Sequence, residues 1–479
     1  MSAWPRGCCQ GDVLRQSLLC VLALGCHHAE PSTEVDAGGS EDAGAEDAPA
    51  LIDAALEGKV CNGQPADLAN PATGCGNVTC DACPLPVGAL AATCSATHTC
   101  DFTCPANTVK TATECATPVP VRTVRIDAGF DHTCAITQTG GVKCWGYNGG
   151  GRLGNDSTAD AHAPVAVVGM TDAVAITAGG GHSCAITVTG NLKCWGPNSA
   201  GQLGTGNYVE SHVAINVPGM TKVVSVSAGN IHTCAVTTAG AVKCWGYNVH
   251  GELGNNSTTQ FFNAPVDVFG LDHGAVAVAA GAMHTCALMA TGAVKCWGDN
   301  RHGQLGNNST VASLVPVDVA NLTTAIDIAV GGDTSFSRSH SCVLTSGQGV
   351  KCWGNHGFGQ LGTGGFESGS TVPVDSLQTS GVIAISAGPL GMLAVRSTGL
   401  KGWGDGSNGE LGSASSTEAL GPVDVPGFGA GLAAAAAGRG HTCALATAGG
   451  VRCVGHNANG QLGNNSTTTA QTAVDVVGL

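Results

Sequence analysis

The stretch GFDHTCAITQTGGVKCWG, Gly129–Gly146, decides how the rest of the chain is interpreted. Two short β-prone runs flank the turn TQTGG, Thr137–Gly141, which is the pattern of a β-hairpin. Cys134 and Cys144 are ten residues apart with the turn at their midpoint, so they face each other in such a hairpin. Facing Cα atoms at a non-hydrogen-bonded site are about 4.5 Å apart, within reach of a disulfide. The stretch therefore predicts a bridged hairpin.

The hairpin recurs along the chain, at intervals of 50 to 56 residues between successive copies. Each copy continues into a Gly-rich loop, such as Tyr247–Thr258, and ends in a run such as PVDVFG, Pro265–Gly270. Four short β-rich runs per copy make a propeller blade, so seven copies predict an all-β, seven-bladed β-propeller of four-stranded blades. The motif KCWG and its variants mark the copies at Trp145, Trp195, Trp245, Trp297, Trp353 and Trp403, with Val454 at this position in copy seven.

The repeat AGxxHTCAxTxxGxVKCWGxNxxGQLGxxxxTxxxxPVxVxG resembles that of the regulator of chromosome condensation family, and the resemblance covers residues 121–479. The resemblance implies a seven-bladed propeller. Nuclear members of that family act as guanine nucleotide exchange factors for a small GTPase and bind chromatin. A secreted bacterial type inhibits β-lactamases. The paired cysteines and the acidic, exported context depart from the general family pattern.

The two ends of the repeat region predict how the ring closes. The chain enters it with Val119–Gly129 and leaves it with Thr472–Leu479. The first copy has no PVxVxG run before it. We therefore expect the C-terminal run to pair into the blade that begins at Val121, which would remove open sheet edges.

Copy six, Gly388–Gly404, has Leu393 and Gly402 where the other copies have cysteine. The two cysteines are lost together, as the halves of one bond would be, so we predict a disulfide within each of the other blades. A metal site that includes a nearby histidine is the alternative, but zinc needs four ligands, or three and water, and the repeat offers no fourth. The predicted pairs are Cys134–Cys144, Cys184–Cys194, Cys234–Cys244, Cys286–Cys296, Cys342–Cys352 and Cys443–Cys453.

Two other repeated residues are interpreted as structural. A histidine lies two residues before the first cysteine of each complete copy, as His132 does in copy one, and we expect it to hydrogen-bond to a neighbouring turn. The tryptophan varies independently of the cysteines, since copy seven keeps both cysteines and has Val454. We expect it to pack between blades.

The chain before the propeller divides into three segments by composition. Residues 1–26 resemble a bacterial lipoprotein signal that ends at Cys26, the residue that would carry the lipid. An ordinary cleavable signal and a chain that is not exported are the alternatives. Residues 27–58 contain nine Asp or Glu and no Lys or Arg, which predicts a disordered linker. Residues 59–117 contain eight cysteines and predict a disulfide-stapled module, and residues 118–479 form the propeller.

Composition limits the partners and the compartment. The net charge of −15 gives no electrostatic footprint for nucleic acid, so we expect no nucleic-acid partner. No apolar run of about 18 residues follows the signal, so membrane contact is expected only through a lipid anchor. The chain is expected to be an exported outer-membrane or cell-surface lipoprotein, or otherwise secreted, and a monomer.

The differences between copies indicate where a partner could bind. Copy five inserts six residues before its histidine, in VGGDTSFSRSHSC, Val330–Cys342, and an aromatic and an arginine on such a loop suit a protein interface. A harmless loop extension is the alternative. The residue after each WG motif also varies between copies, and these side chains should surround one face. The candidate partner-binding residues are Asp333, Phe336, Arg338, Tyr147, Tyr247, Phe261 and Phe262.

The sequence contains no recognised catalytic motif or cofactor fingerprint. We therefore predict a non-enzymatic binding or scaffold protein for an unidentified protein or cell-surface polymer. The alternatives are a regulator-type propeller that acts as an exchange factor or enzyme inhibitor, and a hydrolase or lyase in the central funnel. A funnel lined by small apolar residues would argue against that last alternative.

Overall fold

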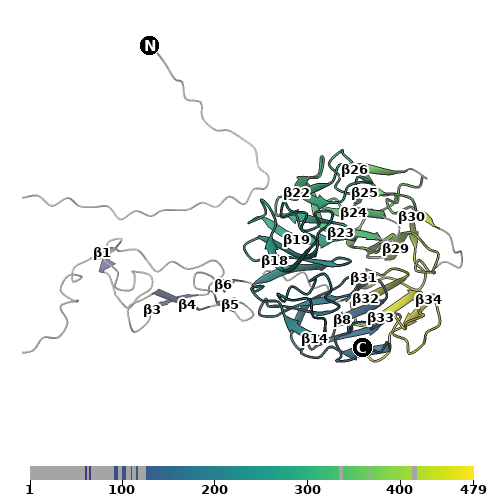
Figure 1. Cartoon of the computed structure of the whole chain (residues 1–479), viewed down its shortest axis with the longest axis horizontal. Helices are drawn as coiled ribbons and strands as arrows, with labels where there is room; N and C mark the ends of the chain where they lie inside the picture. Colours follow the sequence, from purple (N-terminus) through teal and green to yellow (C-terminus); the bar gives the residue numbers. More distant parts are fainter. Residues whose placement is uncertain are drawn as a thin grey trace, which may run out of the picture. The chain divides into compact units, whose positions relative to one another are not determined.

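The computed structural model describes residues 126–333, 338–365, 368–412 and 418–479 in full, and residues 1–125 only through six short strands. The chain divides into two units, residues 1–118 and residues 119–479 (Figure 1). The predicted signal, Cys26 and the acidic linker lie outside the described residues.

The first unit contains three two-stranded antiparallel pairs, within the predicted cysteine-rich module. In the longest pair, the register places Cys94 opposite Cys100. The strands are β1 Val60–Cys61, β2 Gln64–Pro65, β3 Ala91–Cys94, β4 Cys100–Thr103, β5 Val109–Lys110 and β6 Cys115–Ala116.

The second unit folds into seven four-stranded antiparallel sheets, which confirms the predicted blades. Each sheet uses four consecutive strands, and blades one to seven begin with β7, β11, β15, β19, β23, β27 and β31. The strands are β7 Ile126–Ala128, β8 His132–Ile136, β9 Val142–Gly146, β10 Ala161–Ala166, β11 Ala173–Ala178, β12 Ser183–Thr187, β13 Leu192–Gly196, β14 Ser211–Asn216, β15 Val223–Ala228, β16 His232–Thr237, β17 Val242–Tyr247, β18 Phe261–Asp267, β19 Ala275–Ala280, β20 His284–Met289, β21 Val294–Gly298, β22 Ser313–Asp318, β23 Ala325–Asp333, β24 Arg338–Thr345, β25 Val350–Asn355, β26 Gly369–Asp375, β27 Val382–Ala387, β28 Gly391–Arg396, β29 Gly399–Gly404, β30 Ala419–Asp424, β31 Leu432–Ala437, β32 His441–Ala446, β33 Val451–Gly455 and β34 Ala470–Asp475.

The first strand of each blade lies innermost, and these strands contact one another around a central axis (Figure 1). Strand pairing gives the propeller two distinct faces. In blade one, Ala128 at the end of β7 pairs with Thr133 near the start of β8. His132 at the start of β8 pairs with Gly146 at the end of β9. The link between β7 and β8 and the long loop after β9 therefore lie at the same end of the blade. We call this end the loop face. The opposite end, with the hairpin turns between strands two and three, is the turn face.

The expected ring closure is wrong. The last strand, β34, pairs with β33 of its own blade, and the fourth strand of blade one is β10, which follows β9 directly in the chain. The PVxVxG run ends each blade, so the first copy needs no strand from the C-terminus. The ring closes instead through packing of β31 and β32 against β7.

Six disulfides hold the hairpins of every blade except blade six, in the predicted pairing. The Cα atoms of each pair are 4.0 to 4.1 Å apart, and each cysteine faces its partner in the hairpin register, as Cys234 faces Cys244. All twelve cysteines of these disulfides are fully buried, so the disulfides are part of the core. Their sulfur atoms bond to each other, which excludes them as metal ligands.

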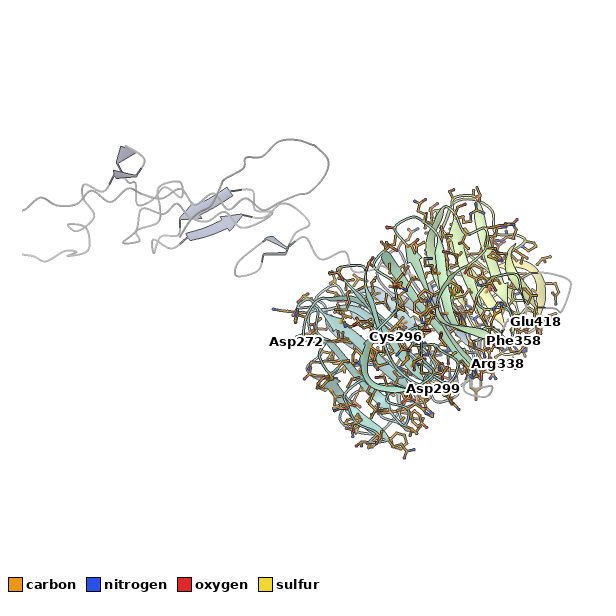
Figure 2. The ribbon with its side chains drawn as sticks, turned by 90° about the horizontal axis from the view of Figure 1, so that it is seen from above. Asp272, Cys296, Asp299, Arg338, Phe358 and Glu418 are labelled. Atoms are coloured by element: carbon orange, nitrogen blue, oxygen red, sulfur yellow. A yellow bond between two sulfur atoms is a disulfide. The ribbon has the colours of Figure 1, made fainter. Side chains whose placement is uncertain are left out.

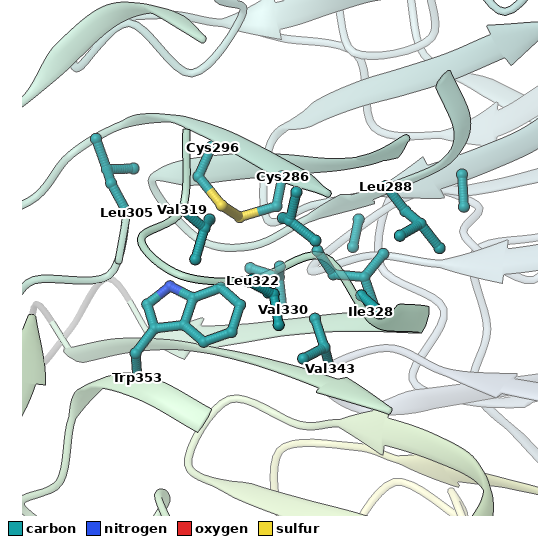
Figure 3. Packing of buried hydrophobic residues seen from close by; sticks show 14 residues of the cluster. Cys286, Leu288, Cys296, Leu305, Val319, Leu322, Ile328, Val330, Val343 and Trp353 are labelled. Carbon is teal, nitrogen blue, oxygen red and sulfur yellow. A yellow bond between two sulfur atoms is a disulfide. The ribbon is translucent and has the colours of Figure 1, made fainter. Parts of the chain in front are cut away.

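The core consists of one apolar cluster at each blade interface. Figure 3 shows the cluster between blades four and five, where the disulfide of Cys286 and Cys296 lies above the indole of Trp353. The tryptophan of the following blade packs on the preceding disulfide at five further interfaces. Between blades six and seven, Leu393 packs with Val454 instead. The losses of the disulfide and of the tryptophan are thus at one interface, so the two do not vary independently, contrary to the expectation from sequence.

Candidate functional site

The long loops of the loop face are organised by an internal asparagine. Asn148 accepts a hydrogen bond from the Leu153 backbone through Oδ1 and donates through Nδ2 to the carbonyl groups of Ser157 and Ala159. The asparagines of blades two, three, four and seven make the same type of contacts, His356 replaces them in blade five, and blade six has Gly406 at this position. The repeated polar residues of these loops therefore serve the fold, and a binding function has to come from residues that differ between blades.

A second repeated contact joins neighbouring blades. His182 Nε2 lies 2.7 Å from the Thr233 hydroxyl of the next blade, and that hydroxyl donates to the Gln202 carbonyl. Trp245 Nε1 donates to the same carbonyl. Since the hydroxyl proton is used, the histidine donates from Nε2. The histidine partner is thus a side chain on the next blade and not a neighbouring turn, as we had expected. The same contact occurs at His132, His232, His284 and His441.

These histidines are held neutral. Burial lowers the pKa of His182, His284 and His441 to about 3 and that of His232 to about 4. The Nδ1 atoms are buried and accept no hydrogen bond among the described residues. Burial is the largest cause at each of these histidines, and at His284 it outweighs the opposing effect of the Asp299 charge.

In blades one, four, five and seven, the residue after the WG motif contacts the residue five positions later, on the same loop. In blade four, Gln304 Nε2 donates to Asp299 at 2.9 Å, and in blade seven Gln461 contacts His456 at 2.9 Å. In blade one the guanidinium of Arg152 lies 4.5 Å from the ring centre of Tyr147. The sequence points only to the first member of each pair, as a residue that varies between copies. The residue five positions later also differs between copies, and this joint variation is the sequence signal that indicates the second member of the pair.

The loop-face end of the axis is nearly closed. A ring of Ala-Gly segments at the ends of the innermost strands leaves a cavity of about 60 Å³. A Cβ atom on Gly129 would clash with the carbonyl oxygen of Gly179 on the next blade, so glycine is required for this approach. The loop face therefore presents a surface around the axis and not an open channel.

The insertion in blade five extends the hairpin of β23 and β24 across this closed end. Asp333 is almost completely buried, and its carboxylate pairs with Arg439 of blade seven at 3.2 Å. The Arg439 guanidinium lies 5.6 Å from the ring centre of Phe130 on blade one. Asp333 is therefore turned to Arg439, where it anchors the hairpin. Phe336 lies outside the described residues.

The other candidate residues also lie on the loop face but on separate blades. The Arg338 guanidinium stacks 4.1 Å from the ring centre of Phe358, and the two side chains lie next to each other in Figure 2. Tyr247 and Phe261 pair across β17 and β18, with ring centres 6.0 Å apart and Phe261 exposed. Phe262 is half-buried against the core of blade three, which leaves less of it for a partner.

The turn-face end of the axis is an open funnel of 650 Å³. Small apolar and hydroxyl side chains of the innermost strands form most of its lining, and Asp127 and Asp327 are its two carboxylates. Asp127 accepts hydrogen bonds from the backbone of Ala128 and Ala178, and burial raises its pKa to about 6. Among the residues that line the funnel, these two carboxylates are the only ionisable side chains.

Among the described residues, no group of three or more His, Cys, Asp or Glu could hold a metal ion. No helix of the described part has the length and apolar character needed to cross a membrane.

The fold and the repeated contacts between blades define a seven-bladed propeller built from homologous repeats. The model of the RCC1-like domain matches residues 194–479, and models of the regulator of chromosome condensation (RCC1) repeat match residues 124–152, 173–202 and 139–186. The first match covers more than half of the chain, so the chain belongs to the RCC1-like domain family.

Similar curated proteins match a part of the propeller. The E3 ubiquitin-protein ligase HERC2 of Homo sapiens is 34% identical over 203 residues, which are 41% of this chain and 4% of HERC2. The probable E3 ubiquitin-protein ligase HERC4 of Homo sapiens is 32% identical over 211 residues, which are 42% of this chain and 19% of HERC4. The match thus spans less than a fifth of the length of either relative.

Solved structures share the fold. Human WBSCR16 superposes with a TM-score of 0.62 at 21% identity, over 70% of this chain and 94% of that protein. Prp20p of Saccharomyces cerevisiae superposes with a TM-score of 0.56 at 21% identity, over 65% of this chain and 80% of Prp20p.

Proposed function

We propose that this propeller is a non-enzymatic binding protein that engages a polypeptide partner through its loop face. The observation that carries the proposal is a set of arginine–aromatic pairs around the closed end of the axis. The pairs are Arg152 with Tyr147, Arg338 with Phe358 and Arg439 with Phe130.

The chemistry of these pairs suits a protein interface. Arginine and aromatic residues are enriched among the residues that dominate binding energy, since they offer large contact areas and directed hydrogen bonds. Stacking on an aromatic ring also fixes a guanidinium before a partner arrives, which reduces the entropy lost on binding. The pairs do not recur in every blade, so they give the face an individual pattern.

The comparisons offer precedent but no partner. Prp20p is described by its binding properties to Gsp1p and histones, which is an example of protein binding by this fold. The ligase activity named for HERC2 and HERC4 belongs to proteins that are far longer than their match to this chain. An exchange-factor or inhibitor role would be a particular form of the proposed binding function.

We also propose that the protein works outside the cytoplasm, as an outer-membrane or cell-surface lipoprotein attached through Cys26, or as a secreted protein. Six buried disulfides support this, because disulfides form and persist in oxidising compartments. The negative net charge of −15 favours a partner other than nucleic acid.

Affinity capture with paired variants tests the binding function. The full chain, an Arg152→Ala/Arg338→Ala variant and a Phe269→Ala variant are compared as baits for envelope and secreted fractions. Phe269 is 61% exposed on the turn face and is the matched control. Partners that bind the full chain and the Phe269 variant, but not the arginine variant, support the proposal. Equal capture by all three baits would contradict a loop-face site.

A further inference from the structure

The interface between blades six and seven contains a cavity that the other interfaces fill. Where His182 reaches toward Thr233, blade six has Gly391 at the histidine position and faces Thr442. A cavity of about 20 Å³ lies between them, with Asp405 and Glu410 in its lining. That volume holds a single group of the size of water.

The Thr442 hydroxyl lines this cavity without a partner. The residue is 2% exposed, so bulk water does not replace the missing imidazole. Five of its equivalents bond to a histidine of the preceding blade, as Thr233 does to His182, and the sixth equivalent is Met392. For Thr442, the described residues provide no such hydrogen bond.

Two carboxyl groups face the same cavity. Asp405 and Glu410 are each 8% exposed. One oxygen of each accepts a backbone N–H of its own loop, from Ser407 and Asn408 respectively, and neither residue forms an ion pair with Lys or Arg among the described residues. Burial raises the pKa of Glu410 to about 7, and the charge of Asp405 adds to the effect. Arg439 also lines the cavity, but it is paired with Asp333 at 3.2 Å. His441, the remaining titratable lining residue, is neutral and bonded to Thr133.

We propose that this cavity binds a primary ammonium group through Thr442, Asp405 and Glu410. An ammonium group is close to water in size and carries three N–H donors, and the cavity offers one hydroxyl and two carboxyl acceptors. Leu390, Met392 and Leu411 form the apolar part of the lining. This proposal goes beyond the proposed function and does not depend on it.

The ammonium group has two sources, a free amine or the lysine side chain of a polypeptide. Both would present the same donors to the same acceptors. The experiment therefore uses methylammonium as a probe for the chemistry and a Gly-Lys-Gly peptide as a probe for a lysine side chain, with Gly-norleucine-Gly as its uncharged match.

Binding is measured by calorimetric titration of the full chain at pH 8 and constant ionic strength. We expect methylammonium to bind with a Kd on the order of 10 mM, since a ligand of two heavy atoms gains little binding energy. Tetramethylammonium has no N–H donor and is larger, so we expect no binding. Tighter binding of the lysine peptide than of methylammonium assigns the site to a lysine side chain. Equal or weaker binding of the peptide assigns it to a free amine.

Three variants connect the binding to the cavity. Glu410→Gln introduces the residue that blades two, four, five and seven have at this position, Gln202, Gln304, Gln360 and Gln461. Gly391→His fills the cavity with the histidine of the other blades, and Thr442→Val removes the hydroxyl. We expect each to weaken methylammonium binding at least tenfold. Glu252→Gln is the matched control, because blade three has an acid at the same position and a filled histidine site, and it should bind as the wild type does.

The proposal is overturned if methylammonium and tetramethylammonium give the same response, which would indicate an ionic-strength effect or a cavity that holds water alone. It is also overturned if Glu410→Gln and Thr442→Val bind methylammonium as the wild type does. Glu410→Gln keeps the test valid should Gly391→His fail to fold, since glutamine is tolerated at this position in four other blades.

Discussion

Leu393 of blade six packs against Val454 of blade seven, at the place where every other interface sets a disulfide against a tryptophan. Gly391, which replaces the repeated histidine, faces Thr442 across the same interface. The three departures from the repeat are therefore one local rearrangement. Leucine is larger than cysteine, so Leu393 takes up space at this interface that the smaller Val454 leaves free.

This coupling predicts the effect of restoring the tryptophan alone. Val454→Trp should destabilise the propeller by about 1–3 kcal/mol, because Leu393 and its neighbours leave no room for an indole. The measurement is the free energy of unfolding in urea. Combination with Leu393→Cys and Gly402→Cys, which face each other in the hairpin register, should recover part of the loss. A neutral single variant would show that the interface is not matched in this way.

The hydroxyl between blades should contribute measurably to stability. Thr233→Val leaves the buried Nε2 of His182 without an acceptor and should cost about 1–3 kcal/mol. Thr189→Val, on the exposed turn of the same hairpin that carries His182, is the control and should change stability by less than about 0.5 kcal/mol. Urea unfolding compares them, and equal effects would contradict the assigned role.

The buried histidines predict acid destabilisation. Their pKa values of about 3 to 4 lie below the ordinary value of 6.5, so the unfolded chain binds more protons as pH falls below 6.5. Their contribution is complete above pH 6.5 and is lost as pH falls toward 3. The raised pKa values of Glu252, about 8, of Glu410, about 7, and of Asp127, about 6, act in the opposite direction, since the native state prefers the protonated forms of these groups.

We therefore expect stability to be greatest near neutral pH and to fall between pH 7 and pH 5, where the more numerous histidines dominate. Urea midpoints at the two pH values test this expectation. A His232→Gln variant should show a smaller fall, and a midpoint that rises from pH 7 to pH 5 would contradict the neutral state of the histidines.

Removal of one disulfide should leave the fold intact. Cys234→Ala with Cys244→Ala opens a loop with a sequence separation of 10, so the chain-entropy model gives a loss of roughly 2–3 kcal/mol at most. Blade six shows that a blade forms without this bond. Circular dichroism should be unchanged while the unfolding midpoint falls. A loss of β-sheet signal would show that the disulfide is required for the blade.

The sequence predicted the blades and the disulfides because both follow from local register and exact repetition. It did not predict the ring closure, since the closing run could be assigned to either neighbouring blade until pairing was seen. The contact between Leu393 and Val454 was not predicted. An alignment of the copies compares equivalent positions, and these two residues occupy different positions of the repeat that meet only across the blade interface. Asp333 was interpreted as a contact residue, whereas its burial against Arg439 depends on where the hairpin folds.

Hydrogen exchange of the full chain with and without its captured partner tests the central claim most directly. The account predicts that the partner slows exchange in the loop-face segments around Arg152, Arg338 and Arg439, and leaves the turn-face segment around Phe269 unchanged. Protection confined to the turn face or to the funnel lining would contradict a loop-face binding function.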